Sequence, residues 1–327
     1  MKLGRLVWFG AGAAAGLYLV DKRRRNLATE PPALRGHRGR SLEPALVELP
    51  GGECVPVIDS GEGPALVLIP GLTGDSQVFR HQIAALSAQY RVIAPNLRVE
   101  FEGVERRFDQ FAHDLATVMD KLDVESACVL GLSFGGPIAL RFATLYPERV
   151  WGLILTNTLA RLDLSHVGLN RTLLIPVARL TSRFAPEVLM RRISDLWGRL
   201  GVWVFDPSPG NERIIEYELR APLRIPLSVG SGRMDTFKDC DLRDDLPRIQ
   251  QPALMVVGAI DTFTPVEWQR EIAELLPNVT YVEIPRGGHL SLISHAEIFN
   301  EAILDWLDQQ TASTDAGVRQ SSSAETR

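Results

Sequence analysis

The stretch Gly131-Leu132-Ser133-Phe134-Gly135 decides the fold of this chain, and it directly follows an apolar run at residues 127–130. A short apolar run of this kind is typical of a buried strand. Pro137 suits the first turn of a helix, because its missing N–H would be unpaired there in any case. The pattern G-x-S-x-G between a strand and a helix predicts a serine on a sharp turn, flanked by two glycines that tolerate close backbone approach. A tight turn without chemistry is the alternative interpretation.

A serine hydroxyl becomes a nucleophile only where a base removes its proton and a third group orients that base. Where the serine lies on a strand-to-helix turn, an acid and then a histidine are expected further along the chain. Asp261 follows the apolar run at 253–258, and His289 lies on a glycine-rich loop after a further strand at 279–284. Ser133, His289 and Asp261 are therefore the candidate nucleophile, general base and orienting acid.

Two alternatives for the acid remain open. Asp261 can instead cap a helix that starts near Pro265, a role that Asp often has. The acid can also come from the end of another strand, for example near Asp163. The remaining histidines fall in helical patterns or lack a partner motif: His81, His113, His295, His37 and His166.

The chain resembles the α/β-hydrolase-fold serine hydrolases over about residues 47–307. The matching segments are 68–73, 131–136, 258–261 and 287–289, and the stretch 108–158 most resembles the branch of esterases, enol-lactonases and carbon–carbon bond hydrolases. The resemblance implies an α/β fold with a mostly parallel sheet, flanking helices and an inserted helical cap. It also implies an oxyanion hole formed by the backbone N–H groups of Leu72 and Phe134.

The chain departs from the family pattern at two places. The family usually has His-Gly where this chain has Pro70-Gly71, which leaves the N–H of Leu72 available but changes its support. The family often has Asp-x-Arg-Gly-x-Gly-x-Ser after the next strand, whereas this chain reads Asn-Leu-Arg-Val-Glu-Phe-Glu-Gly at 96–103. We therefore expect a reshaped loop there.

Composition excludes some other classes of function. The formal net charge of −5 argues against nucleic acid as a partner, and no zinc-type Cys/His spacing is present, so no metal and no cofactor are expected. The three cysteines, Cys54, Cys128 and Cys240, are widely spaced and give no disulfide framework. Cys128, on the central strand, is expected to be a small buried apolar residue.

The N-terminus carries an uncharged segment at residues 6–20, with Arg5 before it and a basic cluster at 22–25. As a helix this segment would span about 22 Å, less than the roughly 30 Å of a hydrocarbon core. Snorkelling of Arg5 would cover the difference, so we expect a membrane anchor. A cleaved signal peptide and a soluble docking helix are the alternatives.

The basic residues are concentrated after this segment, and the more positive flank stays in the cytoplasm. The hydrolase domain is therefore expected to be cytoplasmic, the alternative being export after signal cleavage. The expected divisions are an anchor with its basic flank at 1–25, a linker at 26–46, a core at 47–158 and 249–308, a cap at 159–248, and a disordered tail at 309–327. The cap carries Arg179, Arg183, Arg191 and Arg192 at helical spacing, as a solvated face or as a surface for anionic lipid.

Sequence and resemblance together predict a serine hydrolase that cleaves a carboxylic ester or lactone through an acyl-enzyme. The substrate would be a small-molecule or lipid-like ester, and the oligomeric state is left open. Serine at the turn argues against the epoxide-hydrolase and dehalogenase branches. The alternatives are hydrolysis of a carbon–carbon bond in a ketone-type ring-fission product by the same residues, and a binding or sensing protein that turns over slowly.

Overall fold

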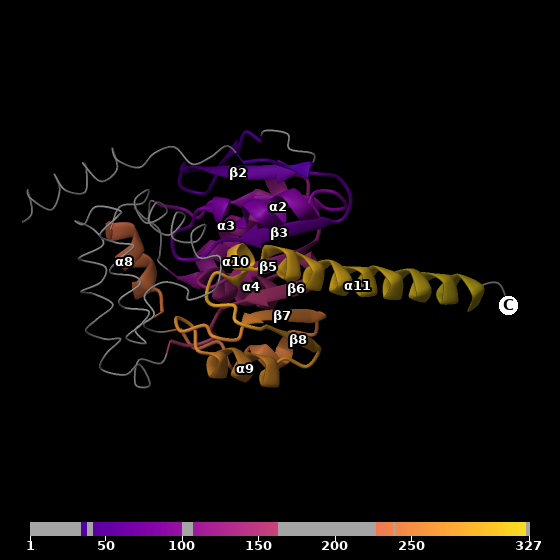
Figure 1. The fold of residues 1–327 in the computed structure, drawn as a ribbon. Helices are drawn as coiled ribbons and strands as arrows, with labels where there is room; N and C mark the ends of the chain where they lie inside the picture. The colour runs from indigo at the N-terminus through magenta and orange to yellow at the C-terminus, as the bar shows by residue number, and fades with distance from the viewer. Residues whose placement is uncertain (1–33, 38–41, 100–106, 163–226, 238–239, 325–327) are drawn as a thin grey trace, which may run out of the picture.

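The computed structural model describes residues 34–37, 42–99, 107–162, 227–237 and 240–324 (Figure 1). The predicted anchor at 6–20 lies outside the described residues. So does most of the predicted cap, including Asp163 and the cap residues Arg179, Arg183, Arg191 and Arg192. Within the ranges described, no helix combines the length and the apolar character that crossing a bilayer requires.

The core of the molecule is a single eight-stranded sheet in the order β1-β2-β4-β3-β5-β6-β7-β8 (Figure 1). The strands β1 and β2, and likewise β2 and β4, pair antiparallel, whereas all the other neighbours are parallel. The mostly parallel α/β fold predicted from the sequence is therefore confirmed. The strands are β1 (Ala45–Glu48), β2 (Cys54–Ser60), β3 (Ala65–Ile69), β4 (Arg91–Pro95), β5 (Ala127–Leu132), β6 (Val150–Thr156), β7 (Ala253–Gly258) and β8 (Val279–Ile284).

The central strands are buried on both faces, as is usual for parallel strands with helices on each side. Successive side chains enter two different cores: Val67 and Met255 lie in one, and Leu68 and Val256 lie in the other. Each fully buried Val, Leu or Met stabilises the fold by roughly 1.5–3 kcal/mol relative to an exposed one. Cys128 is 1% exposed, as expected of a small buried apolar residue, and burial raises the pKa of its thiol.

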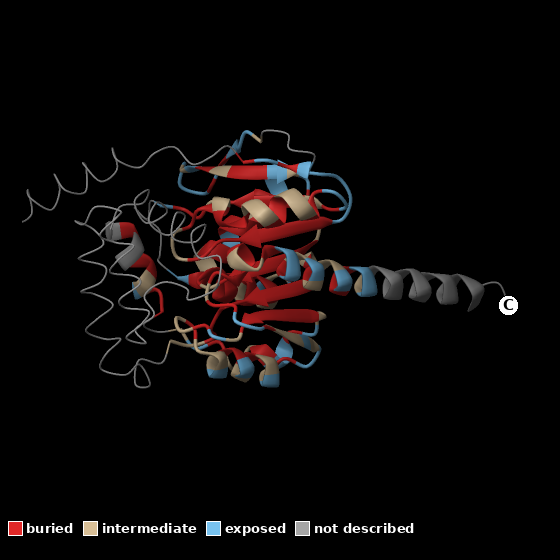
Figure 2. Ribbon diagram, in the orientation of Figure 1, coloured by how far each residue is buried: buried red, intermediate tan, exposed pale blue. Residues whose placement is uncertain are grey.

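Helices cover both faces of this sheet (Figure 2). One face carries α3 (Phe108–Lys121), α4 (Gly135–Leu145) and α9 (Val266–Leu275), and the other carries α2 (Arg80–Leu86), α10 (Ser291–Ser294) and α11 (Ala296–Ala324). Short 3-10 turns lie at η2 (Ser76–Phe79), η3 (Pro147–Arg149) and η6 (Leu246–Arg248). In α3 the buried residues Phe111, Leu115 and Val118 recur at helical spacing and form its apolar face.

The parallel strands all end at one edge of the sheet. Ile69 of β3 pairs with Gly131, and Leu132 of β5 pairs with Thr156 of β6. Gly258 of β7 pairs with Ile284 at the end of β8 in the same way. Ligands of open α/β sheets bind at this carboxyl edge, so the loops after these strands are the place to look for chemistry.

Two segments have more regular structure than the sequence suggested. The helix α11 continues through residues 309–324, where a disordered tail was expected, and it projects away from the sheet (Figure 1). Its first half is fixed by packing, and adding residues to an existing helix costs little because nucleation has already occurred. In the predicted linker, Leu34 is buried in the second core, and its carbonyl accepts a hydrogen bond from the N–H of Leu42 at 2.9 Å.

The described part of the cap begins and ends on the core. An antiparallel bridge joins Arg161 to Asp241, and the N–H of Leu242 donates to the carbonyl of Ala160 at 3.1 Å. The helix α8 (Leu227–Asp235) lies between these two ends in sequence and packs beside the loops that follow β3 and β4. The two chain ends of the inserted segment therefore leave the core side by side.

Candidate active site

Ser133 lies on the turn between β5 and α4, with a backbone φ of 53°. This left-handed conformation costs a residue with a side chain roughly 1–2 kcal/mol. The turn needs glycines on both sides: a Cβ at Gly131 would lie 2.5 Å from the carbonyl oxygen of Gly135, and a Cβ at Gly135 would meet the carbonyl of Ile69. These close approaches are the physical reason for the G-x-S-x-G pattern.

Hydrogen bonds from neighbouring elements hold the turn in this conformation. The N–H of Ser133 donates to the carbonyl of Thr156 at 3.0 Å, and the hydroxyl of Thr158 donates to the carbonyl of Ser133 at 2.6 Å. Thr158 packs so closely on Gly136 that any Cβ at residue 136 would clash with its side chain. The loop after β6 thus supports the serine directly.

The structure brings all three residues of the predicted triad together. His289 Nε2 lies 3.0 Å from Ser133 Oγ, and His289 Nδ1 lies 2.9 Å from Asp261 Oδ2. Because a carboxylate only accepts hydrogen bonds, the imidazole carries its proton on Nδ1 and leaves Nε2 to accept the hydroxyl proton of Ser133. This row of two hydrogen bonds has the geometry that activates a serine.

The side chain of Asp261 is fully buried, and donors surround it. Its Oδ1 accepts from the N–H groups of Phe263 at 2.8 Å and Thr264 at 3.1 Å, and its Oδ2 accepts from the hydroxyl of Thr264 at 2.6 Å. Burying a charge is costly unless hydrogen bonds satisfy it, and these donors do so. Asp261 does not cap α9: Pro265 holds the capping position there, with no side-chain hydrogen bond to the helix end.

The loop that carries His289 is held by Asn157, a residue that the sequence analysis missed. The Asn157 side-chain amide donates to the carbonyl of Gly288 at 2.9 Å and to that of His289 at 2.6 Å, and its oxygen accepts from the N–H of Gly258 at 2.9 Å. The Asn157 backbone has a φ of 47°, a conformation that Asn adopts more readily than most residues. Its position directly after β6, at the carboxyl edge, was the available signal.

Two backbone N–H groups lie close to Ser133, on the loop after β3 and on the turn after β5. Among the described residues, neither the N–H of Leu72 nor that of Phe134 has a hydrogen-bond acceptor. A Cβ built on Gly71 would lie 3.4 Å from the Ser133 Cβ, so the loop after β3 passes directly beside the serine. Free N–H donors at this place can bind the negatively charged oxygen of a tetrahedral intermediate.

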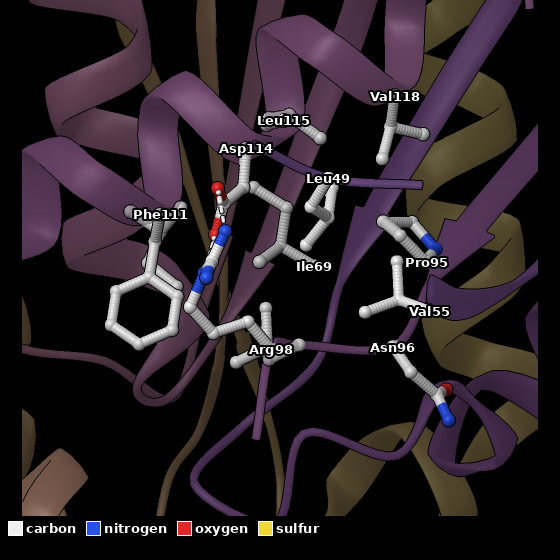
Figure 3. A pocket seen from close by; sticks show the side chains of 12 residues that line it. Leu49, Val55, Ile69, Pro95, Asn96, Arg98, Phe111, Asp114, Leu115 and Val118 are labelled. Carbon is white, nitrogen blue, oxygen red and sulfur yellow. Dashed lines mark hydrogen bonds and ion pairs between the residues drawn. The ribbon is translucent and has the colours of Figure 1, made fainter. Parts of the chain in front are cut away.

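The loop after β4, expected to be reshaped, is described only up to Val99. There the Arg98 guanidinium donates to both carboxylate oxygens of Asp114, at 2.6 and 2.8 Å, and this pair is buried (Figure 3). The hydrogen bond to Asp114 raises the pKa of Arg98, so the guanidinium stays charged. The adjoining cavity, lined partly by Phe111 and Leu115, measures about 20 Å³. It is large enough for about one water molecule and too small for an ester substrate.

Two other described histidines contact partners outside this site. His113 Nδ1 lies 2.6 Å from the hydroxyl of Tyr146, and His295 Nδ1 lies 2.9 Å from that of Ser294. In the described ranges, no group of three His, Cys, Asp or Glu side chains is arranged to hold a metal ion.

The sheet order and the serine turn define an α/β hydrolase. The chain belongs to the alpha/beta hydrolase fold family, whose model matches residues 64–296. Polyketide synthase ThaQ of Burkholderia thailandensis is 30% identical over 85% of this chain, a match that covers 13% of that synthase. RutD of Azorhizobium caulinodans, to which carbamate hydrolase activity is attributed, is 28% identical over 75% of this chain and 91% of its own length.

The chain is also similar to a second curated hydrolase and to a solved esterase structure. A 2-hydroxy-6-oxo-6-phenylhexa-2,4-dienoate hydrolase of Burkholderia cepacia is 27% identical over 76% of this chain and 89% of its own length. The solved structure of a thermophilic esterase from Thermogutta terrifontis matches with a TM-score of 0.63 and 28% identity, covering 82% of this chain and 99% of that one. The expected fold and family are confirmed, and the family is one of hydrolases.

Proposed function

We propose that this protein is a serine hydrolase that cleaves a carboxylic ester or a lactone through an acyl-enzyme. One observation carries the proposal: Ser133, His289 and Asp261 form an unbroken hydrogen-bonded row, beside which the N–H groups of Leu72 and Phe134 have no acceptor among the described residues. The similarity to the Thermogutta terrifontis esterase supports the choice of an ester.

In the proposed reaction, Ser133 Oγ attacks the carbonyl carbon while His289 Nε2 takes the hydroxyl proton. Asp261 holds the imidazole by its Nδ1–H and stabilises the imidazolium that forms. The carbonyl oxygen becomes negatively charged and is bound by the two free N–H groups, each contributing roughly 2.7–4 kcal/mol of transition-state stabilisation.

The tetrahedral intermediate then collapses. The alcohol oxygen leaves with the proton from His289, and the acyl group remains on Ser133. A water molecule repeats the sequence in the opposite sense: His289 accepts its proton, the hydroxide attacks the acyl carbon, and Ser133 Oγ leaves with that proton. A lactone follows the same steps, with its alcohol still attached to the acyl chain.

The test uses p-nitrophenyl esters of increasing acyl length, a panel of lactones and a fluorophosphonate probe. We expect ester or lactone turnover, and probe labelling that is lost in Ser133→Ala. The matched control is Ser294→Ala, which removes a hydroxyl that contacts His295 instead of the triad. Ser294→Ala should be labelled and should turn over like the unchanged protein.

Two results would redirect the proposal. A chain that the probe labels, but that cleaves only a ring-fission ketone, would be a carbon–carbon bond hydrolase like the Burkholderia cepacia relative. A chain that the probe fails to label would favour the binding or sensing alternative.

A further inference from the structure

One short piece of the cap contacts both residues that carry the free N–H groups. Arg233, in α8, donates from its Nη1 to the carbonyl of Leu72 at 2.7 Å. Phe237, one turn further on, packs on the ring of Phe134 with the centroids 5.5 Å apart and the rings nearly perpendicular. The segment 233–237 therefore contacts both sides of the oxyanion hole.

Arg233 is fully buried and holds two core loops together. Besides the Leu72 carbonyl, its Nη2 donates to the carbonyls of Leu97 at 3.1 Å and Arg98 at 2.8 Å. The loop after β3 leaves room for it: Gly74 has a φ of 67°, and a Cβ there would overlap the guanidinium, so a side chain at residue 74 would displace Arg233. The guanidinium thus joins the loops after β3 and β4 to the cap.

Burying the guanidinium of Arg233 costs free energy, because the charged group loses its hydration. Burial lowers the pKa of Arg233 to about 10, which still leaves the group charged at neutral pH. It makes no ion pair with any described residue, and its Nε has no acceptor among them. An apolar side chain of similar volume would fill the same site without the cost of burying a charge. A role in fixing the three carbonyls accounts for this residue better than packing does.

The bonds of Arg233 bear on the orientation of the Leu72 N–H. That N–H belongs to the peptide that joins Gly71 to Leu72, and the carbonyl of this peptide accepts from the N–H of Gly74 at 2.8 Å. The next peptide along is fixed by Arg233 through the Leu72 carbonyl. With the peptides on both sides of the Leu72 Cα held, its N–H has a defined direction. Arg233 thus supplies support at the loop where Pro70 replaces the histidine usual in the family.

Phe134 is held in a comparable manner by aromatic packing. Its ring contacts those of Phe108 at 5.1 Å, Phe111 at 5.4 Å and Phe237 at 5.5 Å, measured between centroids. Phe108 and Phe111 come from α3 of the core, whereas Phe237 comes from the cap. Displacing the cap segment would remove the Leu72 anchor and one wall of the Phe134 site together.

We propose that Arg233 is a positioning residue that couples the docking of the cap to the assembly of the oxyanion hole. The inference rests on the proposed function, because it assumes that the two N–H groups stabilise an oxyanion. A chain whose cap segment is undocked would still hold Ser133, His289 and Asp261 in place, but it would bind the transition state poorly.

The experiment compares Arg233→Met, which keeps the bulk and removes every donor, with Arg233→Lys, which keeps the charge but cannot reach three carbonyls. The matched control is Arg141→Met. Arg141 also links the core to the far end of the cap, through Asp245 at 2.7 Å, but it contacts neither Leu72 nor Phe134. Each variant is assayed with p-nitrophenyl acetate and with a trifluoromethyl ketone, whose adduct on Ser133 carries an oxyanion.

We expect both Arg233 variants to lower kcat about 10²- to 10³-fold, the size of losing one oxyanion donor, while KM changes by less than about threefold. The inhibition constant of the ketone should rise by the same factor as kcat/KM falls. Arg141→Met should lower the melting temperature and leave the affinity for the ketone unchanged.

An Arg233→Lys protein with normal kcat/KM and normal ketone affinity would overturn the proposal, whatever its melting temperature. If Arg233→Met does not fold, Arg233→Lys decides alone, with circular dichroism to establish that it is folded. The unchanged protein tests the proposed function separately. If it neither hydrolyses esters or lactones nor binds the ketone, the proposed function fails and this inference fails with it. If the unchanged protein is active and the Arg233 variants are equally active, only the positioning role is overturned.

Discussion

Replacing Asp261 with Asn changes one atom but should reverse the imidazole tautomer. An Asn side chain can sit at this place in two orientations. The Oδ1 position receives the N–H groups of Phe263 and Thr264, so an amide NH₂ there would leave two buried donors without an acceptor, at about 1–3 kcal/mol each. The NH₂ therefore takes the Oδ2 position, where the hydroxyl of Thr264 can rotate to accept from it.

In this orientation the amide NH₂ points at His289 Nδ1, which lies 2.9 Å from the atom that it replaces. The imidazole then accepts at Nδ1 and carries its proton on Nε2, so Nε2 cannot accept the hydroxyl proton of Ser133. We expect kcat to fall about 10⁴-fold, equivalent to about 5 kcal/mol of lost transition-state stabilisation, with little change in KM. Steady-state kinetics on p-nitrophenyl acetate, with circular dichroism as a check on folding, measure this directly.

Asp163→Asn is the matched control, because Asp163 is the alternative acid that the sequence leaves open. It should leave kcat within about twofold of the unchanged protein. The reasoning would be refuted by an Asp261→Asn protein that keeps kcat within about tenfold of the original. A large loss in Asp163→Asn with none in Asp261→Asn would transfer the acid role to Asp163.

Three further outcomes are expected. Asn157→Ala should lower the free energy of unfolding, measured in urea, by at least about 2 kcal/mol, and it should lower kcat, because the Gly258 N–H and two carbonyls lose their partner. The control Asn278→Ala, at an exposed residue, should lower the free energy of unfolding by less than about 0.5 kcal/mol. Gly136→Ala should cost about 1–3 kcal/mol by forcing Thr158 aside, and an unchanged urea midpoint would contradict the clash. We expect the full chain to sediment with membranes and to resist carbonate, and a chain begun at Ser41 to remain in the supernatant and active. A native protein cut just after residue 20 would instead indicate a cleaved signal.

The sequence predicted those parts of the site that local pattern determines. The turn at Ser133 needs its glycines within two residues, and Asp261 and His289 each follow a recognisable strand, so topology alone brings them to one edge. Arg233 could not be found in this way. It reaches Leu72 across 161 positions, and no motif accompanies it. Asn157 lies at a strand end, but its bonds to the loop of His289 exist only once β6, β7 and β8 are paired.

Residues 309–324 are helical, although their composition predicted a disordered tail. Composition without large apolar residues argues against a packed core, but it does not exclude a helix that continues from a packed one. In α11 the buried side chains of Phe299, Ile303, Trp306 and Leu307 pack in the second core, and the helix continues to Ala324. Within the predicted linker, the side chain of Leu34 is buried in the second core, a contact that composition does not reveal.

The close approach of the two cap ends, at the Arg161–Asp241 bridge, has a consequence for how this chain can vary in length. Nearly a hundred residues separate the end of β6 from the start of β7, although a crossover of about fifteen residues is enough to join two parallel strands. Loop-closure entropy grows only with the logarithm of length, so this insertion costs the pairing of β6 with β7 about 1.7 kcal/mol more than a short crossover would. Lengthening or shortening the insertion by ten residues should then change the closure term by only about 0.1 kcal/mol. A change in the length of the insertion thus has little effect on the closure term of the sheet, whereas a change around 233–237 would disturb the contacts with Leu72 and Phe134.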